Sequence, residues 1–222
     1  TPDGAELLRV NVESTRRIFA HAALAGADHV IFCSSMAVYG EIDADVVSPE
    51  TPSRGPGAYG RSKLECERLL GDLCRTNPRI GGLSIRLPGV VGAGSHDNFL
   101  SDTMARLLAG QPVLARSPDA LFNNVVHIGD LADFLGNALP ALPHGHRVVT
   151  MAADEPQPIR RVVGILEAAA RRTGAVRYED GGKPFLISND AARALGYRPS
   201  TVVDSIVRFA RDVIAFASSS VS

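Results

Sequence analysis

The chain has 222 residues, 45% of them hydrophobic, which is enough to fill the core of one large domain or of one domain with a small appendage. Its 23 Lys and Arg residues against 24 Asp and Glu residues give a formal net charge of -1, so charge favours neither nucleic acid nor a membrane surface as partner. No apolar run reaches the ~18 residues of a membrane span, and the first residues lack the features of a signal peptide, which predicts a cytoplasmic protein.

The first third of the chain alternates between helical and strand patterns. Residues 6–24 carry apolar side chains at helical spacing before Gly26, which predicts a long helix that ends there. Residues 29–33 form a short apolar, β-branched run typical of a buried inner strand. Residues 41–57 contain prolines and no regular period, so we expect a loop, before the helical pattern resumes over residues 59–74.

The same alternation continues along the rest of the chain. Because helices alternate with short apolar strands, we expect parallel strands joined by helical crossovers, hence an α/β protein. The expected strands are 83–87, 125–128 and 147–151, and the expected helices are 97–109, 130–139, 159–172, 189–195 and 202–216.

Tyr59 and Lys63 are four residues apart in the predicted helix 59–74, so both side chains lie on one helix face. A positive charge within about 4–6 Å of a phenol favours the phenolate, and such a tyrosine can act as a general base near neutral pH. The same spacing also occurs between solvated surface residues. The catalytic interpretation therefore depends on what lies nearby.

Ser34 and Ser35 follow the predicted strand 29–33 directly. In a parallel sheet, catalytic groups gather at the carboxyl ends of the strands, which is where these two hydroxyls fall. A hydroxyl in that place can polarise a carbonyl group or pass on a proton; alternatively, the serines cap the strand or begin a turn. Together with Tyr59 and Lys63 they favour an active site.

Five short motifs follow one another along the chain: Asn11 to Thr15, Ser34 to Gly40, Tyr59 to Lys63, Arg86 to Gly92 and Val126 to Ala132. In this order they resemble the extended short-chain dehydrogenase/reductase family, in its branch of NAD-dependent sugar-nucleotide epimerases and dehydratases. The resemblance reaches to about Pro199. It implies a partial doubly wound parallel sheet of the Rossmann-like kind, with a small C-terminal substrate-binding region.

The resemblance also implies roles for single residues. Tyr59 would be the catalytic base, Lys63 would hold the nicotinamide ribose, and Ser35 would donate a hydrogen bond to the reacting oxygen. Pro88 matches the position whose backbone approaches the nicotinamide amide. Tyr59, Lys63 and Pro88 are thus the expected cofactor-binding residues, with NAD or NADP as the cofactor.

Carried over to domains, the resemblance makes residues 1–87 and 124–152 a partial Rossmann-like nucleotide-binding domain that holds the catalytic residues. Residues 88–123 and 153–222 would be the substrate-binding region. The family's first strand and its G-x-x-G-x-x-G turn, which hold the cofactor pyrophosphate, are not in this sequence. We therefore expect these 222 residues alone to be inactive, and the choice between NAD and NADP stays open.

Substrate recognition is expected to involve Ser35, Asn98 and Asn123. The segment at Asn98 is similar to the one that contacts a nucleotide phosphate in the family, and a helix that starts nearby would offer amide N–H groups to such an anion. Many UDP-sugar enzymes of the family have an arginine four residues before the histidine that corresponds to His127. Here that position is Asn123, which weakens pairing with phosphate.

Neither the histidines nor the cysteines suggest a metal site. The six histidines are scattered, and His127 lies within a predicted strand, where we expect it to be packed and hydrogen-bonded. The three cysteines are widely spaced, which predicts reduced thiols. Cys33, beside the serine pair, is expected to be a buried strand residue.

These features favour an NAD(P)-dependent epimerase or dehydrogenase that acts on a sugar nucleotide by Tyr-assisted hydride transfer through a keto intermediate. Elimination of water is disfavoured, because Met36 and Ala37 stand where the family's dehydratases carry Asp and Glu. One alternative is a reductase or dehydrogenase of a small non-nucleotide carbonyl compound or hydroxy acid, which Asn123 favours. An alternative of another class is a catalytically inactive fragment or an interaction module.

The expected assembly is a homodimer with no nucleic acid or membrane partner. In the family, the helices that correspond to residues 6–24 and 59–74 pair across a two-fold axis. Such a contact would bury the helix faces at Leu7, Ile18 or Leu69.

Overall fold

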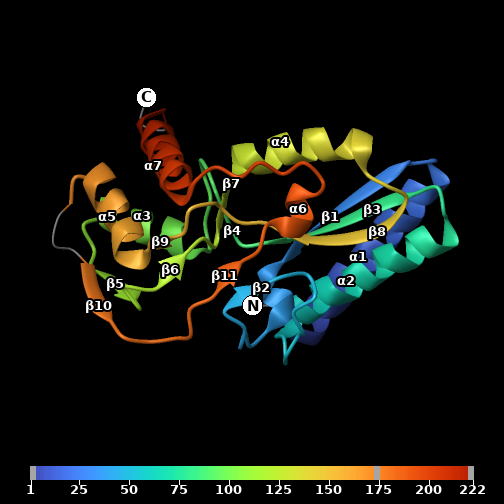
Figure 1. Cartoon of the computed structure of the whole chain (residues 1–222), viewed down its shortest axis with the longest axis horizontal. Helices are drawn as coiled ribbons and strands as arrows, with labels where there is room; N and C mark the ends of the chain where they lie inside the picture. The colour runs from blue at the N-terminus through green and yellow to red at the C-terminus, as the bar shows by residue number, and fades with distance from the viewer. Residues whose placement is uncertain (1–3, 173–175, 220–222) are drawn as a thin grey trace. The chain divides into compact units, whose positions relative to one another are not determined.

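The computed structural model describes residues 4–172 and 176–219, shown in Figure 1. The chain divides into two compact units. Unit 1 comprises residues 1–87, 135–151 and 188–197, and unit 2 comprises residues 88–134, 152–187 and 198–222. The boundary after Leu87 coincides with the expected one. The rest of the division differs from the expected one, because residues 124–134 and Ala152 belong to unit 2 and residues 188–197 to unit 1.

Unit 1 is built on a parallel sheet with the strand order β1-β3-β8. Within this sheet β1 is an edge strand, and its register sets Ser35 opposite Leu87. The elements of unit 1 are α1 (Gly4–Leu24), β1 (His29–Ser35), the 3-10 helix η1 (Met36–Tyr39), β2 (Val46–Val47), α2 (Ala58–Thr76), β3 (Gly81–Leu87), the 3-10 helix η2 (Leu139–Ala141), β8 (Gly145–Thr150) and α6 (Asp190–Arg193).

Helices α1 and α2 run side by side along this sheet (Figure 1). Their apolar faces and the sheet enclose a core that includes Phe19, Val30 and Leu70. Helix α2 lies so close to β3 that a Cβ on Gly82 would collide with the Cys74 thiol, which explains the glycine in this strand. This buried core explains why apolar residues recur at helical spacing in both helices.

Unit 2 combines short strand pairs with three helices. The pairs β4-β7 and β5-β10 are parallel, whereas β6-β9 is antiparallel. The elements are β4 (Gly89–Val91), α3 (Phe99–Leu108), β5 (Val113–Arg116), β6 (Leu121–Phe122), β7 (Val125–His127), β9 (Gln157–Pro158), α5 (Ile159–Ala169), β10 (Val176–Glu179), β11 (Leu186–Ile187) and α7 (Val202–Ser219); α4 (Ile128–Ala138) contains the division between the units.

The core of unit 2 lies between α3, α5 and α7. Met104, Leu166 and Phe209 are among its buried side chains, one from each helix. Strand β7 pairs with β4, which is why residues 124–127 belong to this unit rather than to the sheet of unit 1. Conversely, α6 packs on β8, which assigns residues 188–197 to unit 1.

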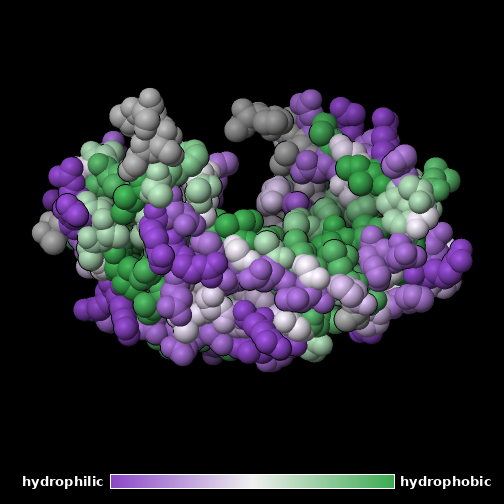
Figure 2. Space-filling view, turned by 90° about the horizontal axis from the view of Figure 1, so that it is seen from above, coloured by the Kyte–Doolittle hydropathy of each residue, from purple (hydrophilic) through white to green (hydrophobic). Residues whose placement is uncertain are grey.

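The predicted helices and strands are confirmed in place and type, with ends that differ by a few residues. None of the helices within the described residues has the length and apolar character that crossing a lipid bilayer requires. Figure 2 shows apolar residues in green between hydrophilic ones on the surface, and in unit 1 the exposed apolar side chains include Val10 and Ile18 of α1.

Candidate active site

Tyr59 and Lys63 lie in the first two turns of α2. The Tyr59 side chain is 46% exposed, and Lys63 is half-buried. Lys63 Nζ is 5.6 Å from the centre of the Tyr59 ring and donates a hydrogen bond of 2.8 Å to the carbonyl oxygen of Cys33. Because that carbonyl belongs to β1, the lysine ties the start of α2 to the sheet, and its ammonium group is held near the phenol ring.

Ser35 is the last residue of β1 and the N-cap of η1, where its Oγ accepts a hydrogen bond of 3.2 Å from the Ala37 amide. Helix η1 packs directly on α2, since a Cβ on Gly60 would overlap the Ala37 carbonyl oxygen. The structure thus brings Ser35, Tyr59 and Lys63 together at the carboxyl end of β1, the sheet edge expected from the sequence.

A cavity of about 220 Å³ opens between α1, β1 and α2 next to these residues. Its wall includes hydroxyl groups from Ser14 and Thr15 of α1 and the Lys63 ammonium group. These hydrogen-bonding groups, and a volume suited to only part of a dinucleotide, fit the ribose end of a nicotinamide nucleotide. The complete lining is Asn11, Ser14, Thr15, Phe32, Tyr59, Lys63 and Cys66.

Two further side chains stabilise this cavity. Asn11 Nδ2 donates to Ser62 Oγ at 3.1 Å, and Ser62 Oγ donates to the Tyr59 carbonyl at 2.8 Å, so α1 is bonded to the first turn of α2. Burial raises the pKa of the Cys66 thiol, which keeps it protonated at neutral pH. The sequence analysis named Ser14 and Thr15 only as part of the motif Asn11 to Thr15, without a role, and did not name Cys66. Helical spacing could have identified them, because Ser14 and Thr15 are three and four residues after Asn11, and Cys66 is three residues after Lys63.

Cys33 and Pro88 flank the same end of the sheet. Cys33 is exposed, so the expectation of a buried strand residue is wrong. The physical reason is that side chains alternate along β1: Val30 and Phe32 face the core under α1 and α2, whereas Cys33 is on the opposite face of the strand. Pro88 follows Leu87, which is opposite Ser35 in the parallel register.

Asn98 of unit 2 is the N-cap of α3. Its Oδ1 accepts from the Ser101 amide at 3.0 Å, and its Nδ2 donates to Ser101 Oγ at 2.8 Å and to the His96 carbonyl at 3.2 Å. These bonds use the side chain to begin the helix. A contact between Asn98 and a substrate phosphate stays a prediction, and the backbone amides of this helix start are the groups that would make it.

Asn123, also in unit 2, is buried and bonds the backbone of one residue in β11. Its Nδ2 donates to the Ile187 carbonyl at 2.9 Å, and its Oδ1 accepts from the Ile187 amide at 3.0 Å. Both polar atoms of the side chain are engaged in this way, so the structure gives Asn123 a role in holding β11. The substrate contact expected from the sequence would have to replace these bonds.

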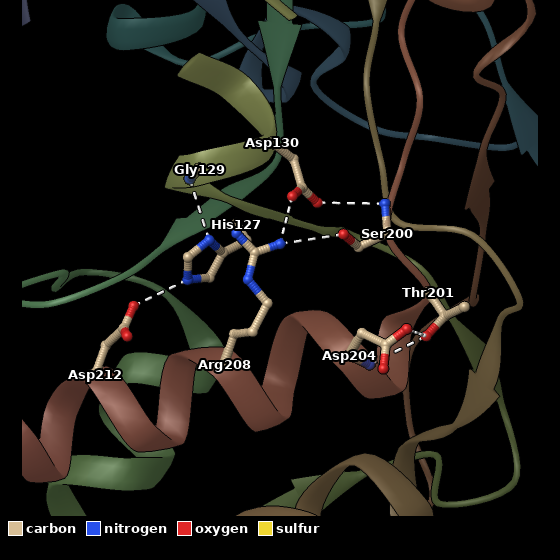
Figure 3. A network of polar contacts seen from close by, with 8 residues as sticks. All are labelled: His127, Gly129, Asp130, Ser200, Thr201, Asp204, Arg208 and Asp212. Carbon is tan, nitrogen blue, oxygen red and sulfur yellow. Dashed lines mark hydrogen bonds and ion pairs between the residues drawn. The ribbon is translucent and has the colours of Figure 1, made fainter. Parts of the chain in front are cut away.

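Unit 2 contains a polar network around the start of α4, drawn in Figure 3. His127 is buried; its Nδ1 accepts from the Gly129 amide, and its Nε2 bonds Asp212 of α7 at 2.9 Å. Arg208 of α7 donates to the buried Asp130 at 2.5 Å. His127 is therefore packed and hydrogen-bonded, as expected, and it serves the attachment of α7. Among the described residues, no group of three His, Cys, Asp or Glu side chains could hold a metal ion.

The model of the NAD dependent epimerase/dehydratase family matches residues 2–150. The chain belongs to this family. The match spans the Ser35, Tyr59 and Lys63 constellation, and the resemblance inferred from the five motifs is confirmed.

Curated relatives extend the comparison at low identity. The UDP-glucose 4-epimerase of Erwinia amylovora is 26% identical over 91% of this chain and 68% of its own length. The N-acetyl-alpha-D-glucosaminyl-diphospho-ditrans,octacis-undecaprenol 4-epimerase of Escherichia coli O157:H7 is 27% identical over 63% of this chain, which spans only 41% of that protein. The D-erythronate dehydrogenase of Cupriavidus necator is 26% identical over 90% of this chain and 67% of its own length.

Solved structures share the fold. MoeE5 in complex with UDP-glucose and NAD matches 96% of this chain and 72% of its own with a TM-score of 0.75 and 24% identity. RMD from Pseudomonas aeruginosa complexed with NADPH matches 95% of this chain and 75% of its own with a TM-score of 0.78 and 20% identity. At such identities the likeness establishes the fold alone, and it confirms the expected Rossmann-like α/β class. The expected cofactor class agrees with an NAD-dependent family.

Proposed function

We propose that this protein is an NAD(P)-dependent epimerase or dehydrogenase of a sugar nucleotide, acting by Tyr-assisted hydride transfer through a keto intermediate. The observation that carries the proposal is the position of Lys63, whose ammonium group is bonded to β1 beside Ser35 and lies 5.6 Å from the Tyr59 ring. The Lys63 ammonium group is thus a fixed positive charge next to a solvent-accessible phenol, and a tyrosine that acts as a base requires this arrangement.

In the proposed mechanism, Tyr59 takes the proton of a substrate hydroxyl. Ser35 Oγ accepts a bond from the Ala37 amide, which leaves the serine hydrogen to donate to the reacting oxygen. Lys63 and the hydroxyls of Ser14 and Thr15 would hold the cofactor ribose, with Pro88 at the nicotinamide amide. A bound nicotinamide cofactor supplies the hydride acceptor.

The oxidised substrate then carries a keto group. An epimerase reduces that group again on the opposite face, whereas a dehydrogenase releases it. Met36 and Ala37 lie in η1 directly after Ser35, so this segment offers no acid for elimination of water. This supports an epimerase or dehydrogenase rather than a dehydratase.

A sugar nucleotide is the substrate class that the UDP-glucose 4-epimerase relative favours. We propose that the amide groups at the start of α3, after Asn98, contact its phosphate. We also propose that the protein is a homodimer and that it is located in the cytoplasm. Its three cysteines are free thiols, which supports a reducing compartment. For the 222 residues alone we expect no turnover, because the residues named above account only for the nicotinamide end of a dinucleotide.

A hydroxy-acid dehydrogenase is the second candidate. Two observations favour it: Asn123 is engaged with Ile187 in place of a phosphate-binding cation, and the Cupriavidus necator relative is a D-erythronate dehydrogenase. Such an enzyme would keep the same roles for Ser35, Tyr59 and Lys63. It would differ in releasing the keto product together with a reduced cofactor.

One assay separates the candidates. A form of the protein that carries the family's G-x-x-G-x-x-G segment is incubated with NAD or NADP and with either UDP-glucose or D-erythronate. Epimers are separated by chromatography, and reduced cofactor is followed by absorbance. Formation of an epimer of UDP-glucose supports the epimerase, and accumulation of reduced cofactor with D-erythronate alone supports the second candidate. No change with any sugar nucleotide or hydroxy acid, under either cofactor, would reject both.

A further inference from the structure

A buried ion pair lies one helical turn beyond the catalytic lysine. Glu67 of α2 and Arg86 of β3 are 5% and 8% exposed, and Arg86 Nη2 and Nε donate to the two carboxylate oxygens at 2.8 and 3.1 Å. This two-point geometry fixes the orientation of both side chains. Burial by itself would lower the pKa of Arg86, but the bonds to Glu67 and Tyr39 raise it, so the arginine stays charged.

The pair is connected to the segments around Ser35. Ser34 Oγ donates to Glu67 Oε1 at 2.5 Å, and Arg86 Nη1 donates to the Tyr39 hydroxyl and the Pro49 carbonyl, each at 2.9 Å. Ser34 precedes the proposed catalytic serine, and Tyr39 is the last residue of η1. One carboxylate therefore joins α2, β3 and the end of β1.

The proposed catalytic groups lie near these residues along the chain, and Ser35 directly follows Ser34. Glu67 is four residues after Lys63 and eight after Tyr59 on the same helix, so the three lie along one side of α2. Ser34 is held to that side through Glu67. A shift of β1 against α2 would therefore break a buried charged hydrogen bond before it could change the distance from Ser35 to Tyr59.

We infer that Ser34 and Glu67 are positioning residues, which set the place of the Ser35 hydroxyl relative to Tyr59 and Lys63. The inference rests on the proposed function, since it assigns these residues an effect on the reaction through Ser35. Small displacements of reacting groups slow the chemical step but leave substrate affinity nearly unchanged, so we expect the effect in kcat.

A double-mutant cycle, made in the same form of the protein as the assay above, tests the inference. Ser34→Ala should lower kcat about 10-fold and leave KM within about 2-fold, because the substrate contacts are kept while the catalytic hydroxyl is displaced. In the Ser35→Ala background, the same change should have almost no further effect on kcat. The matched control is Ser84→Ala, which removes a buried serine of β3 that bonds His146 and should leave kcat unchanged.

Glu67→Gln provides an independent arm, because it removes the charge at nearly constant shape. Circular dichroism and thermal unfolding select variants that keep the fold. Two results would overturn the inference. In the first, the double variant loses kcat by the product of the losses in Ser34→Ala and Ser35→Ala. In the second, Ser34→Ala or Glu67→Gln lowers stability without changing kcat. If Tyr59→Phe retains activity, the proposed function fails first; if Tyr59→Phe is inactive while Ser34→Ala keeps full kcat, only the positioning role fails.

Discussion

At the scale of single residues, the proposed chemistry depends on one exposed phenol and one half-buried ammonium group. Lys63 is held by the Cys33 carbonyl and also lies 4.8 Å from the centre of the Phe32 ring, so two residues of β1 restrain it. Tyr59 has no such restraint on the solvent side, where it is 46% exposed. The lysine is therefore the fixed partner, and the tyrosine is the group that a substrate can reach.

Replacing Tyr59 tests its role as base. Tyr59→Phe deletes one hydroxyl and keeps the ring, so we expect kcat/KM to fall roughly 10²–10⁴-fold while the unfolding temperature stays unchanged. The matched control is Tyr178→Phe, at a tyrosine of β10 with 41% exposure, which should retain full activity. A loss below ~10-fold for Tyr59→Phe would reject it as the base.

His146 offers a prediction for stability against pH. Burial lowers its pKa below the ordinary value, with Arg86 acting in the same direction and Glu67 opposing. The unfolded chain then binds the proton more tightly, so the contribution of His146 to stability is present above its unfolded pKa of about 6.5 and is lost as the pH falls. We expect urea midpoints to fall less between about pH 7.5 and 5 in His146→Gln than in the wild type. Equal pH slopes in both proteins would contradict this.

At the scale of elements, α7 is attached to the start of α4 by two side-chain pairs (Figure 3). Asp130 is buried and accepts from Arg208 and from the Ser200 amide. Gly129 leaves room for this arrangement, because a Cβ there would overlap the Arg208 guanidinium. The helix is thus held by polar contacts as well as by the core residues on its inner face.

Arg208→Met should weaken this attachment. It leaves the Asp130 carboxylate buried without its cation, and loss of a hydrogen bond to a charged group costs roughly 1.5–3 kcal/mol of unfolding free energy. Urea denaturation measures the difference. Arg211→Met is the control, since Arg211 lies on the same helix and is exposed; we expect its effect to stay within about 0.5 kcal/mol. A comparable change in both variants would show that the Asp130 pair does not stabilise the protein.

Which elements the sequence could predict follows from their length. Windows such as residues 59–74 and 202–216 contain several helical turns, so their apolar period is unambiguous, and the structure has α2 and α7 there. Strands β6 and β9 have two residues each, too few for any period, and they form only because they pair with each other across 34 intervening residues. Such non-local pairing leaves no local signal in the sequence.

The same distinction applies to the candidate site. Ser35, Tyr59 and Lys63 stand in short motifs with fixed spacing, so the sequence alone could bring them into one hypothesis. The Glu67–Arg86 pair joins residues 19 positions apart on different elements, and nothing in either local segment predicts it. The amide of Asn123 looked available in the sequence because its partner, Ile187, is 64 residues away.

At the scale of the whole molecule, the chain passes repeatedly between two units. The proposed catalytic residues Ser35, Tyr59 and Lys63 all belong to unit 1, whereas Asn98 and Asn123 belong to unit 2. The family match ends at residue 150, so helices α5, α6 and α7 all lie beyond it. Chemistry is therefore proposed for unit 1, and substrate contacts are proposed for unit 2.

The surface of unit 1 favours self-association through α1 and α2. These helices line a groove of about 630 Å³ whose half-buried apolar residues include Leu8, Val12 and Leu64. Ile18 on α1 is 64% exposed, in agreement with the helix face expected at an interface. Leu69 is half-buried and packs against the core of unit 1, so its place at an interface stays a prediction. The side chain of Leu7 lies outside the described part of the structure.

A two-fold contact through this groove would bring its charged residues, Arg9, Arg61, Glu65 and Arg68, against the same residues of a second copy, so that arginine can meet glutamate. We expect light scattering at micromolar concentration to report twice the mass of one chain. Leu64→Glu should give single chains, because it buries an unpaired charge in the apolar part of the groove. Leu108→Glu, at an exposed leucine of α3 in unit 2, should leave the mass doubled. A wild-type protein with the mass of one chain would exclude the dimer, and a doubled mass that survives Leu64→Glu would place the interface elsewhere.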